Sequence, residues 1–394
     1  MNYPVTALSV AYFIISTLLL PLMVQAFSCL VAWIISLISS KMRNKNIITM
    51  VVSLLFLAAY FYLYSKMGDI ISGLIANGTA IAVAFKKYAF PAYYFGVGIA
   101  EHNLTYLLLY TVCTLVVFEL VYAILSRSFR QITTAKKGTA RIKYKERSMH
   151  VSSPAAALLR KDFRHFIGNP MYVLNAWMGE ILLVVACVAM LIKKDILTEF
   201  LPILNGEGEI MGLILCVILC GLSCTNLITA PAISLEGKNL WIAQSIPVPA
   251  ATVLRAKVKL QMLLCIPITA LSALLMGIVL KLELLTLVLT VLVPAAFNLF
   301  TALLGVVVNL HFPKFDYINE TVVIKQSMST MICMFGSMAV VLVLALLYAL
   351  LLSASVAPTL FLAVCLVLLV IVCVLMWRYL GHGGSARFAA LQAD

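Results

Sequence analysis

Residues 356–377, VAPTLFLAVCLVLLVIVCVLMW, contain no charged side chain. A helix that crosses the hydrocarbon core of a bilayer needs roughly 20 mostly apolar residues, so this stretch is long enough to span a membrane. Further apolar runs of similar character occur at 47–64, 103–125, 174–192, 211–231, 259–280, 284–310 and 328–352. We therefore predict an all-α fold, a polytopic transmembrane helical bundle with 9–10 spans.

The overall composition supports the same fold class. Of 394 residues, 63% are hydrophobic and only 11% are charged. Soluble domains carry about 25% charged residues, which they need to cover their surface. Lipid-facing helices have no such need because their backbone polar groups are satisfied internally. This composition excludes an ordinary soluble enzyme or binding domain.

The first 40 residues leave two alternatives open. A single helix over residues 5–40 would be about 54 Å long, which exceeds a hydrocarbon core of about 30 Å. The segment could be a tight hairpin that turns near Pro21, or one kinked helix with a lead-in outside the bilayer.

Charge in the loops predicts the orientation. The net charge is +13, and residues 127–165 carry much of it. The basic residues of this stretch are Arg127, Arg130, Lys136, Lys137, Arg141, Lys143, Lys145, Arg147, Arg160, Lys161 and Arg164. Basic loops stay on the cytoplasmic side, where they also contact anionic lipid headgroups. Alternation from this loop places the C-terminus in the cytoplasm. Nucleic-acid binding is the weaker interpretation, since no aromatic platform accompanies the charge.

Few polar side chains interrupt the predicted spans. The intramembrane candidates are Glu119, Glu180, Asn226 and Asn298. Both acids lie toward the inside ends of their spans, where a long side chain reaches the headgroups at little cost, so we expect structural roles. The alternative is an ion-coupled secondary transporter that uses Glu119 or Glu180 as an intramembrane carboxylate.

Signatures of catalysis and of metal binding are nearly absent. The sequence contains no GxxxxGK[ST] loop, no HExxH and no GxSxG, so we expect no catalytic residue, no cofactor and no metal. Cys216, Cys220 and Cys224 share one helix face, where packing is favoured over a redox or metal site. His311 and Asp316 form an HxxxxD pair that would suit a membrane enzyme, a third and disfavoured class.

Two amphipathic segments lie on the predicted inside. In residues 153–169, Ser153 is placed to cap a helix with Pro154 at its first position. Ala156, Leu159, Phe163 and Phe166 would share its apolar face. The loop SLEGKNLWIAQSIPVPAATVLRAKVK, residues 234–259, predicts a short helix that ends at Pro247. It is either a docking element or a loop whose Trp241 anchors at the interface.

Three stretches resemble the permease subunits of bacterial type-2 ABC exporters. They are SLEGKNLWIAQSIPV in the loop just described, LLRKDFRHFIGNPMYVLN at 158–175 and NLHFPKFDYINETVVIKQ at 309–326. The resemblance implies a connecting helix at 153–169, a coupling helix at 235–246 and six spans in a second transmembrane unit, 153–394. Residues 1–125 would then be a partial first unit that lacks its N-terminal spans, and 126–152 a basic cytoplasmic linker.

The resemblance also implies a function. The chain would be the transmembrane permease of an exporter in the bacterial plasma membrane, without enzymatic activity of its own. Its partners would be a separate cytosolic ABC ATPase, membrane lipids, and a second copy or a second permease. The ATPase-docking residues would be Glu236, Lys238, Asn239, Leu240 and Trp241. The connecting helix would use Leu159, Phe163 and Phe166. The substrate is left open.

Overall fold

The computed structural model describes residues 7–40, 45–76, 86–134, 152–192 and 208–392. Within these ranges the chain is helical and contains no β-strand, which confirms the predicted all-α polytopic bundle. Six of the described helices are long and apolar enough to cross a membrane, or seven if one bent pair is a single span. Two shorter apolar helices, at 178–192 and 208–223, fall in two more of the predicted spans.

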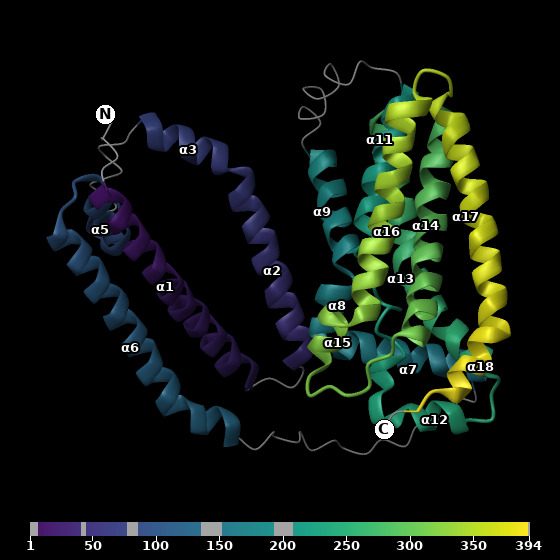
Figure 1. Ribbon diagram of the computed structural model, residues 1–394, viewed down its shortest axis with the longest axis horizontal. Coiled ribbons are helices and arrows are strands. Elements are labelled where there is room, and N and C mark those ends of the chain that lie inside the picture. The colour runs from purple at the N-terminus through teal and green to yellow at the C-terminus, as the bar shows by residue number, and fades with distance from the viewer. Residues whose placement is uncertain (1–6, 41–44, 77–85, 135–151, 193–207, 393–394) are drawn as a thin grey trace. The chain divides into compact units, whose positions relative to one another are not determined.

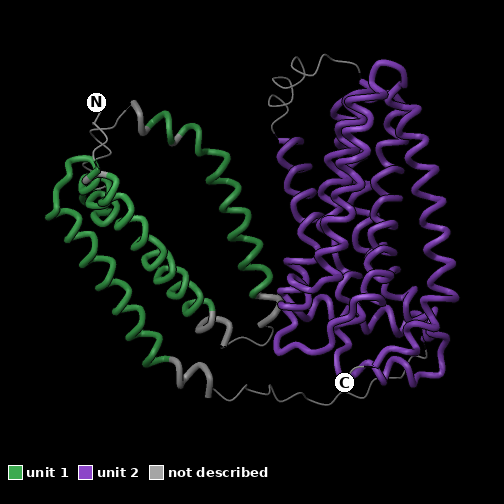
Figure 2. The backbone as a smooth tube through the Cα atoms, viewed as in Figure 1, with its two compact units in different colours: residues 1–147 green, residues 148–394 purple. Residues whose placement is uncertain are grey.

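The chain divides into two compact units, residues 1–147 and 148–394 (Figure 2). Unit 1 contains α1 (Ala7–Ser40), α2 (Lys45–Ser65), α3 (Met67–Ala76), α5 (Phe90–Ala100) and α6 (Leu104–Thr134). The stretch between the predicted spans 47–64 and 103–125 therefore includes two helices, α3 and α5. Of the predicted linker 126–152, the first nine residues continue α6, and 135–151 lie outside the described residues.

Helix α1 decides between the two alternatives for the N-terminal segment. It is one helix of 34 residues with Pro21 inside it, and not a hairpin. It packs along α6, where the Trp33 Nε1 donates to the Ser128 hydroxyl at 2.8 Å. A second bond joins the Tyr110 hydroxyl to the carbonyl of Ser16 at 3.5 Å. These two contacts with α6 lie on either side of Pro21.

Unit 2 is a bundle built around α14. Its elements are α7 (Pro154–Gly168), α8 (Pro170–Ala176), α9 (Met178–Ile192), α11 (Gly208–Ser223), the 3-10 helix η2 (Ser234–Asn239), α12 (Leu240–Ser245), α13 (Ala250–Val279), α14 (Leu284–His311), α15 (Glu320–Gln326), α16 (Met328–Leu347), the π-helical turn η3 (Tyr348–Leu352), α17 (Pro358–Gly381) and α18 (Gly383–Ala390). Helix α14 contacts α11, α13, α16 and α17, and Figure 1 shows it among them.

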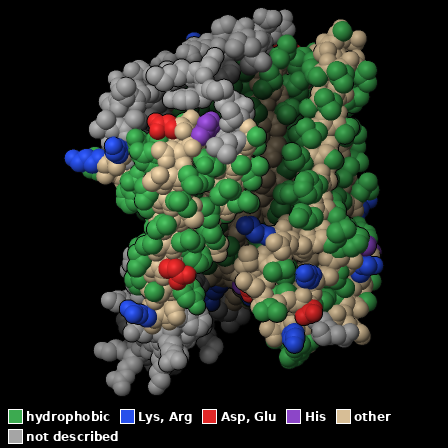
Figure 3. All heavy atoms as spheres, turned by 60° about the vertical axis from the view of Figure 1, so that its left-hand side comes forward, with side chains coloured by type: hydrophobic (Ala, Val, Ile, Leu, Met, Phe, Trp, Pro, Cys, Tyr) green, Lys and Arg blue, Asp and Glu red, His purple; other side chains and the backbone are tan. Residues whose placement is uncertain are grey.

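Short helices gather at one end of this bundle. Helices α7, α12 and α18 lie below the long helices (Figure 1), and their side chains Leu158, Leu240 and Phe388 share one buried core with Leu310 of α14. Figure 3 shows hydrophobic side chains over most of the described surface, with few charged groups among them. This distribution is the one expected of helices that face lipid along their length.

Helix α11 ends at Ser223, eight residues before the predicted end of its span at 231. Residues 224–233 continue as buried, irregular backbone. Such backbone is tolerated at membrane depth only where protein groups satisfy its hydrogen bonds. Side-chain amides do so here: the Gln261 Oε1 accepts from the Thr229 N–H at 3.0 Å, and the Asn309 Oδ1 accepts from the Ile233 N–H at 2.8 Å. These partners are remote in sequence, so the local pattern could not reveal the break.

Gly305 permits α14 to pack against this irregular segment. A Cβ at Gly305 would collide with the Thr229 hydroxyl and come within 2.9 Å of the Ala230 amide nitrogen. We expect Gly305→Ala to destabilise the bundle by about 1–3 kcal/mol through overpacking, seen as a lower thermal midpoint in detergent. Gly336→Ala is the matched control, since open space surrounds that position. An equal effect of the two substitutions would contradict the packing role of Gly305.

Candidate functional site

Helix α7 begins and ends where the sequence predicts. The Ser153 hydroxyl accepts from the Ala156 N–H at 3.4 Å, and Pro154 occupies the first turn. At the other end, the Asn169 side chain accepts from the N–H groups of Met171 and Tyr172. Asn169 thereby caps α8, so that the chain turns from the amphipathic helix directly into the bundle.

The packed face of α7 differs from the predicted one. Phe166 is buried and Leu159 half-buried, but Phe163 is 36% exposed and Ala156 is exposed as well. The buried face instead passes through Leu158 and Asp162. The reason is electrostatic: the Asp162 carboxylate turns inward to an ion pair with Lys257, and the helix rotates with it. Phe163 remains on the outer surface, as suits a helix in the headgroup layer.

The predicted coupling helix is two short pieces. The 3-10 helix η2 is followed directly by α12, and η2 itself is broken at Gly237, whose φ is +52°. A glycine adopts this conformation readily, and a Cβ there would lie 2.9 Å from the Tyr317 hydroxyl. The element is therefore bent around Tyr317 and not continuous over 235–246.

The bend leaves some of the predicted docking residues buried and others exposed. Leu240 is only 1% exposed and belongs to the core, and Glu236 is engaged in ion pairs, so neither faces outward as predicted. Lys238 and Asn239 are exposed, and Trp241 is 64% exposed. Ile242, which the sequence analysis missed, is 45% exposed beside Trp241. The spacing of Leu240 and Ala243 gives the signal for the inward face, since residues three apart share a side of a helix.

Leu240→Ala is expected to destabilise the fold by about 2–5 kcal/mol, because it removes a fully buried side chain from the core. The measurement is the thermal midpoint of the purified chain in detergent. Ile242→Ala is the control on the same helix, and it should leave the midpoint nearly unchanged. If Leu240→Ala left the midpoint unchanged as well, the inward assignment of Leu240 would be wrong.

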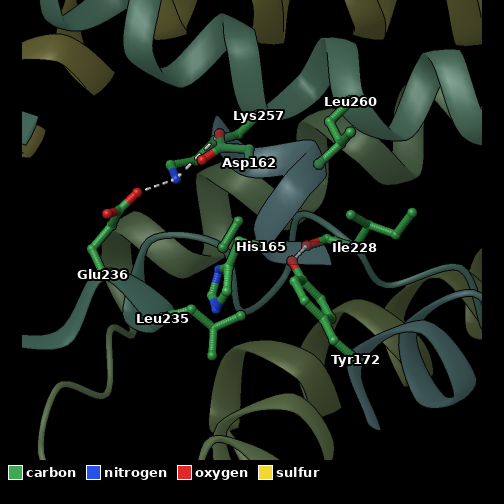
Figure 4. A pocket seen from close by; sticks show the side chains of 9 residues that line it. Asp162, His165, Tyr172, Ile228, Leu235, Glu236, Lys257 and Leu260 are labelled. Atoms are coloured by element: carbon green, nitrogen blue, oxygen red, sulfur yellow. Dashed lines mark hydrogen bonds and ion pairs between the residues drawn. The ribbon is translucent and has the colours of Figure 1, made fainter. Parts of the chain in front are cut away.

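An ion-pair cluster joins three elements behind this surface (Figure 4). The Glu236 carboxylate of η2 lies 2.6 Å from the Lys161 ammonium of α7 and 2.7 Å from the Lys257 ammonium of α13. Lys257 also lies 3.6 Å from Asp162. The Lys257 side chain is 3% exposed, so its charge depends on these two carboxylates. The cluster therefore links η2 to both α7 and α13.

The same cluster sets the protonation of Glu236. Burial by itself would raise the pKa of this carboxyl group, but the nearby ammonium groups of Lys257 and Lys161 outweigh burial. They lower the pKa from 4.5 to about 2. Glu236 is therefore ionised at neutral pH, and the four-residue cluster of Lys161, Asp162, Glu236 and Lys257 carries no net charge. We call it the coupling cluster.

A small pocket adjoins the coupling cluster. Figure 4 shows His165 and Tyr172 beside it, with the Tyr172 hydroxyl donating to the carbonyl of Ile228. Burial and then the negative charge of Asp162, Glu236 and Glu320 raise the pKa of Tyr172. A hydroxyl that keeps its proton remains a donor, so this bond ties α8 to the irregular segment.

A second group of polar side chains lies deeper in unit 2. The Asn226 amide donates to the Glu180 carboxylate at 2.9 Å and to the Asn298 Oδ1 at 3.3 Å. The Thr269 hydroxyl donates to the same Glu180 oxygen, Oε1, at 2.7 Å. Three of the four predicted intramembrane residues are thus brought together. We call this group, completed by Ser223, the polar cluster.

The environment of Glu180 corrects its predicted location. We expected it to reach toward the headgroups, but it is fully buried among helices α9, α13 and α14 and the irregular segment. The break between α8 and α9 at Trp177 faces Asn226, which draws Glu180 inward. Its second oxygen, Oε2, has no hydrogen-bond partner among the described residues. Glu119 lies exposed on α6, in unit 1.

The remaining candidate residues, the three cysteines and His311, do not form a catalytic or metal-binding site with other described residues. Cys216, Cys220 and Cys224 are buried, free thiols packed with apolar side chains of α14 and α17. Among the residues that the structure describes, no group of three metal-ligating side chains occurs. His311 is exposed and stacks on Tyr379, with ring centroids 6.3 Å apart.

Comparison with known proteins gives one match. A family model described as "Putative ATP-binding cassette" matches residues 70–378, which is most of the chain and includes both clusters. No curated protein and no solved structure matches. The description names a cassette, whereas the matched residues that the structure describes are helices and the sequence has no P-loop.

Proposed function

Because the chain belongs to the ABC-related family whose model it matches, we propose that this component is the membrane-spanning permease of an ABC exporter. A separate cytosolic ATPase would supply the energy, since the sequence lacks the loop that binds nucleotide phosphates. The chain itself would have no enzymatic activity. The three stretches that resemble exporter permeases all lie in unit 2.

The observation that carries the proposal is the outward face of η2 and α12, formed by Lys238, Asn239, Trp241 and Ile242. An exposed Trp and an exposed Ile side by side, rimmed by polar groups, are typical of an interaction site. Trp is also the residue type most enriched among those that dominate binding energy. We name these four residues the docking face.

The coupling cluster connects the docking face to the membrane-spanning helices. When the ATPase moves the docking face, Glu236 would pull Lys161 and Lys257 with it, and so α7 and α13. Helix α13 carries Thr269 of the polar cluster and packs against α9 and α14, which carry Glu180 and Asn298. A discrete rearrangement there would change which side of the membrane the bundle opens to.

The permease function implies an orientation in the membrane and a partner for the chain. The end of unit 2 with α7, α12 and α18 would face the cytoplasm of a bacterial plasma membrane, together with the C-terminus. Basic residues at this end agree with that orientation. The complete exporter would pair the chain with a second copy or a second permease. Nucleic acid has no part in the proposal.

Affinity purification from mildly solubilised native membranes tests this function. We expect a protein with a Walker motif to copurify with the intact chain and to be lost with Trp241→Ala. Phe163→Ala removes an exposed aromatic side chain from α7 at the same end of unit 2, and it should leave the copurification intact. Absence of any ATPase with the intact chain would count against the permease proposal.

A second candidate is an ion-coupled secondary transporter. The observation in its favour is Glu180, a buried carboxyl group with one oxygen unpartnered among the described residues. Buried carboxyl groups in transporters mark proton and ion paths. Uptake or export by membrane vesicles that survives ATP depletion but is abolished by Glu180→Gln would favour this candidate. Transport that stops on ATP depletion would favour the exporter.

A further inference from the structure

A groove on the lipid-facing surface of unit 2 lies between α14 and α17. Its volume is about 260 Å³, and its walls are apolar side chains of the two helices apart from one arginine. Val370 and Val374 of α17 line it and are exposed. Trp377 and Arg378 follow on the same face of α17, because residues three, four, seven and eight apart share a helix side. The groove therefore has an apolar body and a basic end.

Two arginines at that end have no acidic partner in the part of the chain that the structure describes. Arg378 lines the groove, and the guanidinium carbon of Arg255, from α13, lies 5.1 Å from the centre of the Trp377 ring. Neither forms an ion pair with any residue that the structure describes, in contrast to Lys161 and Lys257. The Arg255 Nε is buried without a hydrogen-bond acceptor in the described part of the chain. A buried donor of this kind is costly to leave unpaired.

The depth of this end suits an interfacial ligand. Arg378 lies in the last turn of α17, so it stands where an apolar span gives way to the α18 end of the bundle. Trp side chains favour the headgroup level of a bilayer. Guanidinium groups bind phosphate through paired hydrogen bonds and are more weakly hydrated than ammonium groups. An apolar channel that runs toward a phosphate-binding end matches the two parts of a phospholipid.

We infer that the groove between α14 and α17 binds an anionic phospholipid. One acyl chain would lie along Val370 and Val374, and the phosphate would lie against Arg378 and Arg255 beside Trp377. The lipid would come from the leaflet that meets the α12 and α18 end of unit 2. This site is separate from the docking face and does not depend on which partner occupies that face. It requires only that α17 spans a membrane.

Quenching of Trp377 fluorescence tests the inference. The full chain is placed in phosphatidylcholine vesicles that contain a minor fraction of either brominated phosphatidylglycerol or brominated phosphatidylcholine. The difference between the intact chain and Trp377→Phe isolates the Trp377 signal. Each arginine near a membrane surface contributes about fivefold in preference for anionic lipid. With two arginines, we therefore expect the anionic lipid to quench Trp377 at a roughly 25-fold lower fraction than the zwitterionic lipid does.

Substitutions identify the residues responsible. Arg378→Gln and Arg255→Gln should each lower the preference for the anionic lipid about fivefold. In the double variant, the two brominated lipids should quench Trp377 equally. Arg164→Gln, an exposed arginine of α7, is the charge-matched control and should preserve the preference. Arg378 is exposed, so its substitution should leave the thermal midpoint unchanged.

Three results would overturn the inference. The first is equal quenching of the intact chain by the two brominated lipids. The second is an equal loss of preference in Arg164→Gln, which would indicate a general surface charge effect. The third is displacement of the brominated phosphatidylglycerol by inorganic phosphate at matched ionic strength, which would indicate a site for free phosphate.

Discussion

Glu236→Gln is expected to cost about 3–5 kcal/mol in the free energy of unfolding, because among the described residues it leaves the buried Lys257 ammonium with only the Asp162 carboxylate. The same change should disconnect η2 from α7 and α13, so that ATPase binding no longer drives transport. The measurement pairs a thermal midpoint in detergent with transport-linked ATP hydrolysis by the reconstituted exporter.

Two controls distinguish this effect from a general loss of charge. Asp69→Asn breaks an ion pair with Lys66 whose partners are largely exposed, and we expect a change near zero since surface pairs contribute little. Lys257→Met added to Glu236→Gln should recover part of the lost stability by removing the unpaired charge. An effect of Glu236→Gln no larger than that of Asp69→Asn would contradict the coupling cluster.

The pH dependence gives an independent signature. The pKa of Glu236 is lowered from 4.5 to about 2 in the folded chain, so its stabilisation is complete above pH 4.5 and is lost as the pH falls toward 2. The corresponding contribution is about 3 kcal/mol. The Glu236→Gln variant should lack this part of the acid destabilisation. Parallel acid profiles for the two chains would show that Glu236 is not held ionised by its partners.

Trp241→Ala is expected to weaken ATPase binding by about 2–4 kcal/mol, or roughly 30- to 900-fold in Kd, as for a central aromatic residue of an interface. The side chain is already exposed in the described chain, so its removal should leave the thermal midpoint almost unchanged. The experiment is a binding titration of the purified ATPase against the chain in nanodiscs.

The neighbouring positions make the Trp241 result specific. Ile242→Ala should weaken binding less, since it removes a smaller exposed side chain. Lys238→Gln should act mainly through the association rate, because rim charges steer encounter. Leu240→Ala should lower stability first. A loss of binding in Trp241→Ala that was accompanied by unfolding would not support the docking face.

The long helices could be predicted from the sequence because apolar length alone determines them. The run at 356–377 is within two residues of α17 at its start and four at its end. The capped start of α7 was also predictable, since Ser153 and Pro154 act within one helical turn. These features depend on residues that are neighbours in the chain.

The features that sequence reasoning missed depend on distant residues. Asp162 shifted the expected face of α7 through its ion pair with Lys257 of α13, which is remote in sequence. The early end of α11 depends on amide groups of α13 and α14, and the burial of Glu180 depends on Asn226. In the docking face, Leu240 and Trp241 are adjacent hydrophobic residues. Only the bend at Gly237 and the core beneath it determine which of the two points outward.

Site-specific photocrosslinking from position 241 tests the central claim most directly. A photoreactive phenylalanine analogue replaces Trp241 in the full chain in its native membrane, and the same analogue at Phe163 serves as the control. The account predicts a crosslink from position 241 to a protein with a Walker motif, stronger than any from position 163. Crosslinks from position 241 to lipid alone would contradict it, since Trp241 would then be an interfacial anchor and not a docking residue.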